Sequence, residues 1–172
     1  MPLLHVLRHA KSSWNEAIAD RERPLNRRGR ETARLVGRHL AAATGPLDLA
    51  LCSTALRTRE TLELVLAGSA PRPRIALEDG IYLASGAHLL ARLRALAETD
   101  DNVLLIGHNP GLHELAVKLA DPESPEFAAL TNGKFPTAAR ASFRIAPSWS
   151  AIDRSRHELI AYVTPKSLGG ES

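Results

Sequence analysis

The sequence predicts a single α/β domain of three layers, with helices flanking a mostly parallel central sheet. Short apolar segments alternate along the chain with longer segments whose apolar residues recur at helical spacing, which is typical of strand–helix–strand units. A length of 172 residues suits one domain with a sizeable core, and no internal repeat or low-complexity linker divides it. We expect residues 1–172 to form one domain, with its motifs in residues 3–119 and its last strands at about residues 141–163.

The first half of the chain contains two apolar segments that predict buried strands, each followed by a helix. Leu3–Leu7 is the first segment and Leu47–Cys52 the second. We expect the first helix to start after an N-cap at Asn26 and to end before Gly45–Pro46. The second helix is expected to start at Ala55 or the residue after it.

The second half is predicted to continue the alternation and to close with two further strands. The expected elements, in chain order, are a strand at Arg74–Leu77, a helix at Gly86–Glu98, a strand at Val103–Ile106, a helix at Leu112–Leu119, and strands at Ala141–Ile145 and Glu158–Val163. A loop of sequence Pro-Ser-Trp-Ser separates the last two strands.

Composition excludes several classes of function. The net charge of +3 is spread over scattered arginines, and an aromatic fraction of 4% is too low for a base-stacking surface, so we expect no nucleic-acid partner. Cys52 is the only cysteine, which excludes a disulfide framework and a thiolate-rich metal site. No apolar stretch is long enough for a membrane span, and the N-terminus does not resemble a secretion signal, so we expect a cytoplasmic protein.

Polar side chains suited to an anion follow three of the predicted strands. Arg8 and His9 come after the first strand, residues 53–61 with Arg57 after the second, and His108 after the strand that ends at Ile106. Ligands bind at the carboxyl ends of strands in parallel sheets, and a guanidinium group suits phosphate well. The sequence therefore predicts a phosphate site at this edge of the sheet. His108 is also placed to cap the helix that follows it.

These three segments resemble the motifs of a known family. Residues 8–15 (RHAKSSWN), 53–61 (STALRTRET) and 103–111 (VLLIGHNPG) are similar, in order and spacing, to the three motifs of the histidine phosphatase superfamily. The phosphoglycerate mutases are its best-known branch, so the resemblance implies a phosphoglycerate mutase-like fold. The short chain, its RHAKSSW opening and residues 20–29 are most similar to the SixA-type phosphohistidine phosphatases.

The residues at the three strand ends suit phosphoryl transfer without a metal or another cofactor. His9 can attack phosphorus as neutral imidazole, while Arg8 and Arg57 hold the phosphoryl oxygens. The resemblance implies that His108 completes the pocket as a further donor. A covalent phosphohistidine on His9 would then be hydrolysed by water. The further candidate substrate contacts are Asn15, Ser12 and Lys11.

The general acid of the wider family has no clear counterpart. Phosphoglycerate mutases and related acid phosphatases place Glu or Asp in the segment that corresponds to residues 77–83, and the expected position falls near Leu83. Glu78 and Asp79 are the candidate acids in that segment. An imidazole leaving group needs protonation less than an alkoxide does, so the lack of an acid favours a phosphohistidine substrate.

The favoured hypothesis is a phosphatase that dephosphorylates a phosphohistidine on a signalling or carrier protein. One alternative is a phosphatase of the same superfamily for small phosphate monoesters, and another is a phosphate-binding module without turnover. The basic stretch Arg21–Arg30 is either a charged loop and helix start or a docking face for an acidic partner.

The remaining histidines and the two tryptophans are expected to be structural. His5 lies inside the first strand and is expected to be a core histidine. Trp14 and Trp149 are expected to pack rather than to form substrate platforms. The other histidines, expected to pack or to lie on the surface, are His39, His88, His113 and His157.

Overall fold

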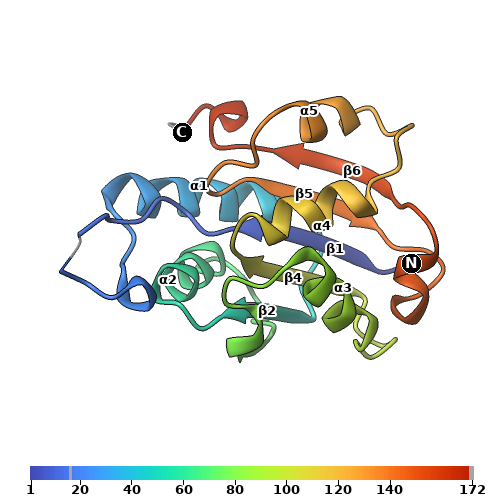
Figure 1. The fold of residues 1–172 in the computed structure, drawn as a ribbon, viewed down its shortest axis with the longest axis horizontal. Helices are drawn as coiled ribbons and strands as arrows, with labels where there is room; N and C mark the ends of the chain where they lie inside the picture. The colour runs from blue at the N-terminus through green and yellow to red at the C-terminus, as the bar shows by residue number, and fades with distance from the viewer. Residues whose placement is uncertain (16, 171–172) are drawn as a thin grey trace.

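The computed structural model describes residues 1–15 and 17–170 and has the predicted three layers, with one six-stranded sheet between helices (Figure 1). The strands are β1 (Leu3–Arg8), β2 (Leu49–Ser53), β3 (Arg74–Glu78), β4 (Asn102–Gly107), β5 (Arg140–Arg144) and β6 (Glu158–Val163). Their order across the sheet is β3-β2-β4-β1-β5-β6. The predicted single α/β domain with a central sheet is confirmed.

The sheet is mostly parallel, as predicted, and β5 alone runs against the others. The pairs β1–β4, β2–β4 and β2–β3 are parallel, whereas β5 is antiparallel to both β1 and β6. Because of this reversal, the start of β5 lies beside the end of β1, where Leu7 pairs with Arg140. The chain before β5 is thereby held at the edge where β1 ends, with Ala138 N–H donating to the His9 carbonyl at 3.0 Å.

Alternation along the strands divides the core between the two faces of the sheet. Residues such as Val6 and Leu105 pack with α3 and α4 on one face, and residues such as Leu7, Cys52 and Ile106 pack with α1 and α2 on the other. In Figure 1, α3 and α4 lie in front of the strands. The helices are α1 (Arg27–Ala43), α2 (Leu56–Val65), α3 (Gly86–Arg94), α4 (Gly111–Leu119) and α5 (Phe127–Asn132).

Two glycines allow the loops at the carboxyl edge to pack closely. A Cβ on Gly29 in α1 would lie 2.0 Å from the carbonyl oxygen of Lys11, in the loop after β1. A Cβ on Gly111 in α4 would lie 1.9 Å from the carbonyl oxygen of Ala84, in the loop before α3. Neither position has room for a side chain, so both glycines fix loops that surround the candidate site.

The predicted helices start within one residue of the expected positions, while one of them ends earlier than expected and one further helix was not predicted. The Asn26 side chain caps α1 by accepting from Gly29 N–H at 2.8 Å, and α2 starts at Leu56. The third helix was expected to reach Glu98 but ends at Arg94. The reason is that the backbone changes there to bonds between residues three apart, with Ala95 N–H donating to the Arg92 carbonyl at 3.2 Å and Leu96 N–H to the Leu93 carbonyl at 3.1 Å. The Glu98 carboxylate accepts from the backbone N–H groups of Trp149 and Ser150.

Helix α5 was not predicted, because its six residues are too few to show a helical period. Within residues 1–15 and 17–170, none of the helices has the length and apolar composition that a membrane crossing requires.

Candidate active site

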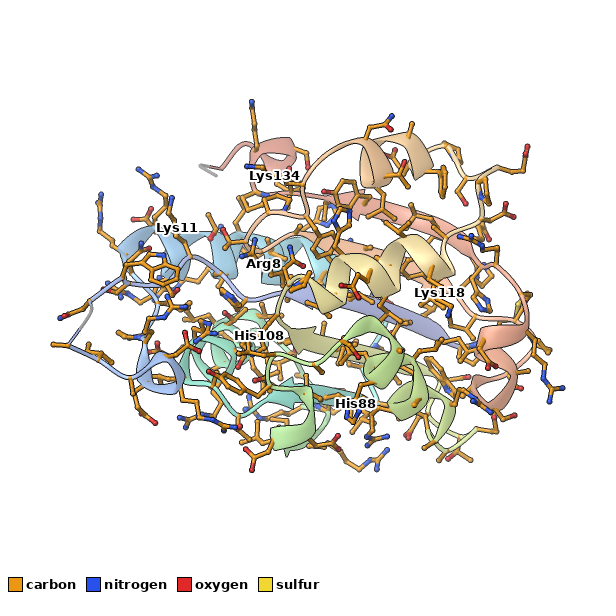
Figure 2. The ribbon with its side chains drawn as sticks, viewed as in Figure 1. Arg8, Lys11, His88, His108, Lys118 and Lys134 are labelled. Carbon is orange, nitrogen blue, oxygen red and sulfur yellow. The ribbon has the colours of Figure 1, made fainter. Side chains whose placement is uncertain are left out.

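The three polar segments meet at one cavity at the carboxyl ends of β1, β2 and β4. The cavity has a volume of about 770 Å³, and Arg8, His9, Arg57 and His108 all line it. Figure 2 shows Arg8 and His108 at this edge of the molecule, with Lys11 and Lys134 further out. The fold therefore brings together four side chains from three segments that lie far apart in the sequence, as the positions of the strand ends predicted.

His9 presents one ring nitrogen to this cavity in a defined protonation state. The ring is buried, and its Nδ1 lies 2.7 Å from the carbonyl oxygen of Ala10. A carbonyl only accepts, so Nδ1 carries the proton and Nε2 of the neutral ring carries the lone pair. Nε2 forms no hydrogen bond with any residue that the structure describes. Burial, reinforced by the charges of Arg8 and Arg57, lowers the pKa of His9 to about 3, which keeps the ring neutral at physiological pH.

The two arginines place unused donors around His9. Arg8 Nη1 donates to the Phe135 carbonyl at 3.1 Å, and burial lowers the pKa of its guanidinium group. Arg57 is almost fully buried, and its Nη1 donates to the main-chain carbonyl of Asp20 at 2.8 Å. The Nε atoms of both arginines are buried without a hydrogen-bond partner among the described residues. Unpaired buried donors are costly, and a site that binds an anion can compensate for them.

His108 is held by hydrogen bonds to Ser53 and Arg57. Its Nε2 lies 2.7 Å from Ser53 Oγ, and its Nδ1 lies 3.4 Å from Arg57 Nη2. A guanidinium group only donates, so Arg57 Nη2 donates to Nδ1 of His108, which carries no proton in the neutral ring. The proton of His108 therefore resides on Nε2, which donates to Ser53 Oγ, and the same hydroxyl oxygen also accepts from Ala55 N–H at 3.3 Å. Pro110 is the N-cap of α4 and makes no side-chain cap bond. The His108 ring bonds Ser53 and Arg57 instead of capping that helix.

The two histidine rings of the site lie close together, and the pKa of each is lowered. The centroids of His9 and His108 are 5.4 Å apart. Burial, together with the positive charge of Arg57, lowers the pKa of His108 to about 4. A bound dianion would oppose both effects, so the site is built to hold negative charge.

Sequence reasoning missed a carboxylate in the pocket. Asp20 lines the cavity, and its Oδ2 lies 3.1 Å from Arg57 Nη2 while its Oδ1 lies 3.2 Å from Arg23 Nε. The Tyr82 hydroxyl also donates to Asp20 Oδ2. That hydrogen bond and the charge of Arg57 lower the pKa of Asp20 to about 2. Asp20 is therefore ionised and acts as the resting anionic partner of Arg57. The family-like stretch 20–29 contains Asp20 and Arg23, but its charges do not show which side chains turn inward.

The weaker candidate contacts are divided between the pocket and the outside. Lys11 and Ser12 line the cavity, and Ser12 Oγ accepts from Arg23 Nη1 at 2.6 Å. Asn15 is not among the lining residues, and its Oδ1 accepts from Ala17 N–H at 3.0 Å. The structure thus brings Lys11 and Ser12 to the site and leaves Asn15 outside it.

Neither candidate acid reaches the pocket. Glu78 is paired with Arg92, whose Nε and Nη2 donate to its two oxygens at 2.8 and 2.9 Å. The Asp79 carboxylate accepts from Thr54 and Arg21 at the surface. Leu83, near the position where the acid was expected, lines the cavity instead. The residues described contain no group of three or more His, Cys, Asp or Glu side chains placed to hold a metal ion.

The expectation that Trp14 is a packing group is wrong. Its side chain is 83% exposed at the edge of the cavity, with the Arg23 guanidinium 3.8 Å from the ring centroid. Trp149 is fully buried as predicted, and its Nε1 donates to the Asp100 carbonyl at 2.7 Å. His5 is the core histidine that its position in β1 predicted, since it is buried and both ring nitrogens are bonded.

The other four histidines behave as packing or surface groups in most respects. His157 is buried and His88 is exposed, while His39 Nδ1 accepts from Arg140 Nη1 at 3.2 Å. His113 is the exception, because it lines the cavity while its Nε2 bonds the Leu130 carbonyl at 2.9 Å.

Comparisons with known proteins agree with this geometry. Residues 4–80 match the model of the histidine phosphatase superfamily (branch 1). An uncharacterised protein of Mycobacterium tuberculosis is 32% identical over 162 residues, which cover 93% of this chain and 100% of that protein.

Solved structures with the same fold are assigned as phosphohistidine phosphatases. A Nakamurella multipartitia structure assigned as the phosphohistidine phosphatase SixA superposes with a TM-score of 0.83 and 26% identity, covering 95% of this chain and 96% of that one. An Agrobacterium tumefaciens structure with the same assignment gives 0.81 and 27%, covering 96% and 99%.

The fold, the histidine–arginine pocket and the matched motifs define a class: the chain belongs to the histidine phosphatase superfamily, and it is a phosphatase. Within that superfamily it belongs to the SixA-type branch, to which its sequence motifs and these structures both point.

Proposed function

We propose that this protein is a metal-independent phosphohistidine phosphatase that works through a covalent phosphohistidine on His9 and acts on phosphohistidine carried by a protein. The observation that carries the proposal is the state of His9. Its ring is fixed by Ala10, kept neutral by burial, and presents an unpaired Nε2 beside the Arg8 and Arg57 guanidinium groups.

In the first step, His9 Nε2 attacks phosphorus in line with the bond that breaks. The new P–Nε2 bond forms as the P–N bond to the substrate imidazole breaks. That imidazole carries a proton on its other ring nitrogen, so it takes the electron pair and leaves as a neutral ring. Charge on the three equatorial oxygens is stabilised by Arg8, Arg57 and His108, which gains a proton on Nδ1 when the bound dianion raises its pKa. These positive groups supply the stabilisation that a metal ion gives in other phosphatases.

In the second step, a water molecule attacks the phosphorus of the phosphoenzyme. The P–Nε2 bond breaks, its electron pair returns to Nε2, and the water protons leave with the phosphate and the solvent. His9 is then again the neutral ring with its proton on Nδ1. The enzyme therefore returns to its starting state without a co-reactant.

The missing acid supports phosphohistidine as the substrate. Leu83 lines the cavity near the position expected for a general acid, and Asp20, the carboxylate among the described lining residues, is ionised by its contacts with Tyr82 and Arg57. An alkoxide leaving group requires a proton, whereas an imidazole leaves more readily. A further SixA structure, described as a protein histidine phosphatase complexed with tungstate, shares the fold with a TM-score of 0.78 at 24% identity.

A phosphoenzyme trap tests the proposal. The protein is mixed in EDTA with phosphohistidine, and separately with p-nitrophenyl phosphate, then quenched and analysed by mass spectrometry. We expect an acid-labile, base-stable phosphate on His9 in the wild type and in the control His88→Ala, and none in His9→Ala. Faster labelling by phosphohistidine supports the proposed substrate class.

Faster labelling by the ester would favour the small-ester phosphatase. Absence of both adduct and turnover would leave a phosphate-binding module, and an adduct that forms only when a divalent metal is added would refute metal independence.

A further inference from the structure

The pocket is larger than a phosphoryl group requires. Its volume is about 770 Å³, whereas one water molecule takes about 30 Å³ of liquid volume and pockets of several hundred Å³ hold ligands of drug size. His9, Arg8, Arg57 and His108 occupy one region of this lining. The remaining space faces whatever is attached to the phosphoryl group.

Exposed apolar side chains gather at this pocket. Trp14 is 83% exposed and Leu83 is 56% exposed, and both line the cavity. Among the large apolar side chains described, only the terminal Met1 matches this degree of exposure, at 73%, and Leu77 on β3 follows at 48%. Exposed aromatic and aliphatic groups beside a functional site mark an interaction surface rather than a stability requirement.

Trp14 is held in place although it is exposed. The Arg23 guanidinium lies 3.8 Å from its ring centroid. Arg23 is itself buried, and it donates to Ser12 Oγ at 2.6 Å and to Asp20 Oδ1 at 3.2 Å. The cation–π contact therefore fixes the indole on a rigid base, so a partner that binds it has little side-chain entropy to remove.

Leu83 is presented by an unusual backbone conformation. Its φ of 51° lies in the left-handed region, which bulky side chains rarely adopt. The following residue, Ala84, packs against Gly111 of α4, where no Cβ would fit. The loop is thus held in a conformation that costs energy and that places an apolar side chain at the cavity.

The charges around the pocket select an anionic partner. Lys11 and Lys134 line the cavity together with Arg8, Arg23 and Arg57 (Figure 2). Asp20 is the carboxylate in the described part of this lining, and Arg57 and Arg23 already pair with it. Five cations exceed what one phosphoryl dianion neutralises, so the surface complements further negative charge on the substrate.

Resting on the function proposed above, we propose that Trp14 and Leu83 are docking contacts for the polypeptide that carries the phosphohistidine, an acidic segment with apolar side chains close to that residue. The phosphoryl group enters between the arginines, the apolar side chains contact Trp14 and Leu83, and the acidic side chains face Lys11 and Lys134.

The test compares three donors: free phosphohistidine, a peptide whose phosphohistidine is flanked by Leu and Glu, and the same peptide with Lys in place of Glu. We expect the wild type to favour the acidic peptide over free phosphohistidine by about tenfold or more in kcat/KM. Trp14→Ala and Leu83→Ala each reduce that ratio about tenfold. Trp14→Phe, which keeps a ring for Arg23, retains most of it. Leu77→Ala, an exposed leucine outside the cavity lining, is the matched control and changes neither value.

A binding measurement separates this inference from the proposed function. The acidic peptide, with a phosphonate-bearing triazole in place of phosphohistidine, is titrated into the wild type and Trp14→Ala by calorimetry. We expect Kd to weaken about tenfold in the variant. If the wild type turns over no donor but this difference remains, the proposed function fails and the docking surface stands.

Three results would overturn the docking surface. Equal losses of kcat/KM on free phosphohistidine and on the peptide would show that Trp14 and Leu83 only support the pocket. A wild type that prefers the lysine peptide would refute the charge argument. A nucleoside monophosphate that outperforms every peptide would assign Trp14 to stacking with a small aromatic substrate.

Discussion

Strand β1 connects two buried clusters of histidine and arginine that differ in one respect. His5 and His9 are both buried, and burial lowers the pKa of His5 to about 4 and that of His9 to about 3. In the core cluster, both nitrogens of His5 are bonded, to Ser142 Oγ at 2.7 Å and Asn102 Oδ1 at 2.9 Å. In the pocket, one nitrogen of His9 is bonded and the other has no partner among the described residues.

The arginines differ in the same way. Buried Arg140 donates through Nε to Ser142 Oγ at 3.1 Å and contacts His39 through Nη1 at 3.2 Å. Arg57 is as deeply buried, but its Nε has no described partner. Buried arginines and a histidine with a lowered pKa are therefore common to a structural and a functional cluster, and the unfilled hydrogen-bonding capacity distinguishes the active one.

The largest expected effect separates the two histidines. His9→Ala should lose phosphatase activity by about 10⁴-fold or more, because it removes the nucleophile. His5→Ala should keep the activity of each folded molecule but lose about 1–3 kcal/mol of unfolding free energy, because Ser142 and Asn102 lose their partner. Turnover assays and urea denaturation measure the two effects. A folded His5→Ala protein without activity would contradict the comparison.

The second effect separates the two arginines. Arg57→Lys should lose about 10²–10³-fold in kcat, because a point charge cannot reproduce the donors of a planar guanidinium around the phosphoryl oxygens. Arg140→Lys should lower the thermal midpoint and leave kcat near that of the wild type. Steady-state kinetics measures kcat, and differential scanning calorimetry measures the thermal midpoint, for both variants. Equal kcat values for the two variants would show that Arg57 does not contact the reacting group.

The third effect is the loss of stability at acidic pH that follows from the lowered pKa values of His5 and His9. The folded-state pKa of His5 is about 4, below its ordinary value of 6.5, so the unfolded chain binds the proton more readily as pH falls. Stability from this group is complete above pH 6.5 and is lost towards pH 4, a loss of about 2 kcal/mol between pH 7 and 5. Urea denaturation at both pH values should show a smaller fall in His5→Gln and in His9→Gln. An unchanged fall in both variants would assign acid sensitivity elsewhere.

The smallest effect concerns the anion that Arg57 holds at rest. Asp20→Asn should tighten binding of inorganic phosphate by about three- to tenfold, because a carboxylate no longer occupies Arg57. Asp79→Asn, which removes the same charge from the surface pair with Arg21, is the control and should change phosphate affinity little. Calorimetric titration compares them. Weaker phosphate binding in Asp20→Asn would instead show that Asp20 orients Arg57 for the substrate.

The sequence predicted the strands and the placement of the main site residues because both follow from local patterns. Apolar runs such as Leu3–Leu7 define buried strands, and the ends of parallel strands meet at one edge, which brings Arg8, His9, Arg57 and His108 to one cavity. Asp20 and Tyr82 could not be predicted, because they lie in non-periodic loops and meet only through tertiary packing. The exposure of Trp14 was missed for a related reason, since an aromatic residue within such a motif is more often packed than held outside by an arginine.

Cys52 lies one residue before Ser53, the hydrogen-bond partner of His108, yet its thiol is buried and stays protonated. It is buried on the α1/α2 face of the sheet, and burial raises its pKa to about 12. Oxidants and alkylating agents attack the thiolate, which this residue does not form at physiological pH. Phosphatases that use a cysteine nucleophile are silenced by peroxide, whereas a reaction carried on a ring nitrogen with a protonated thiol behind it continues. Phosphoryl groups would therefore still be removed during oxidative stress, when thiolate-dependent enzymes have stopped.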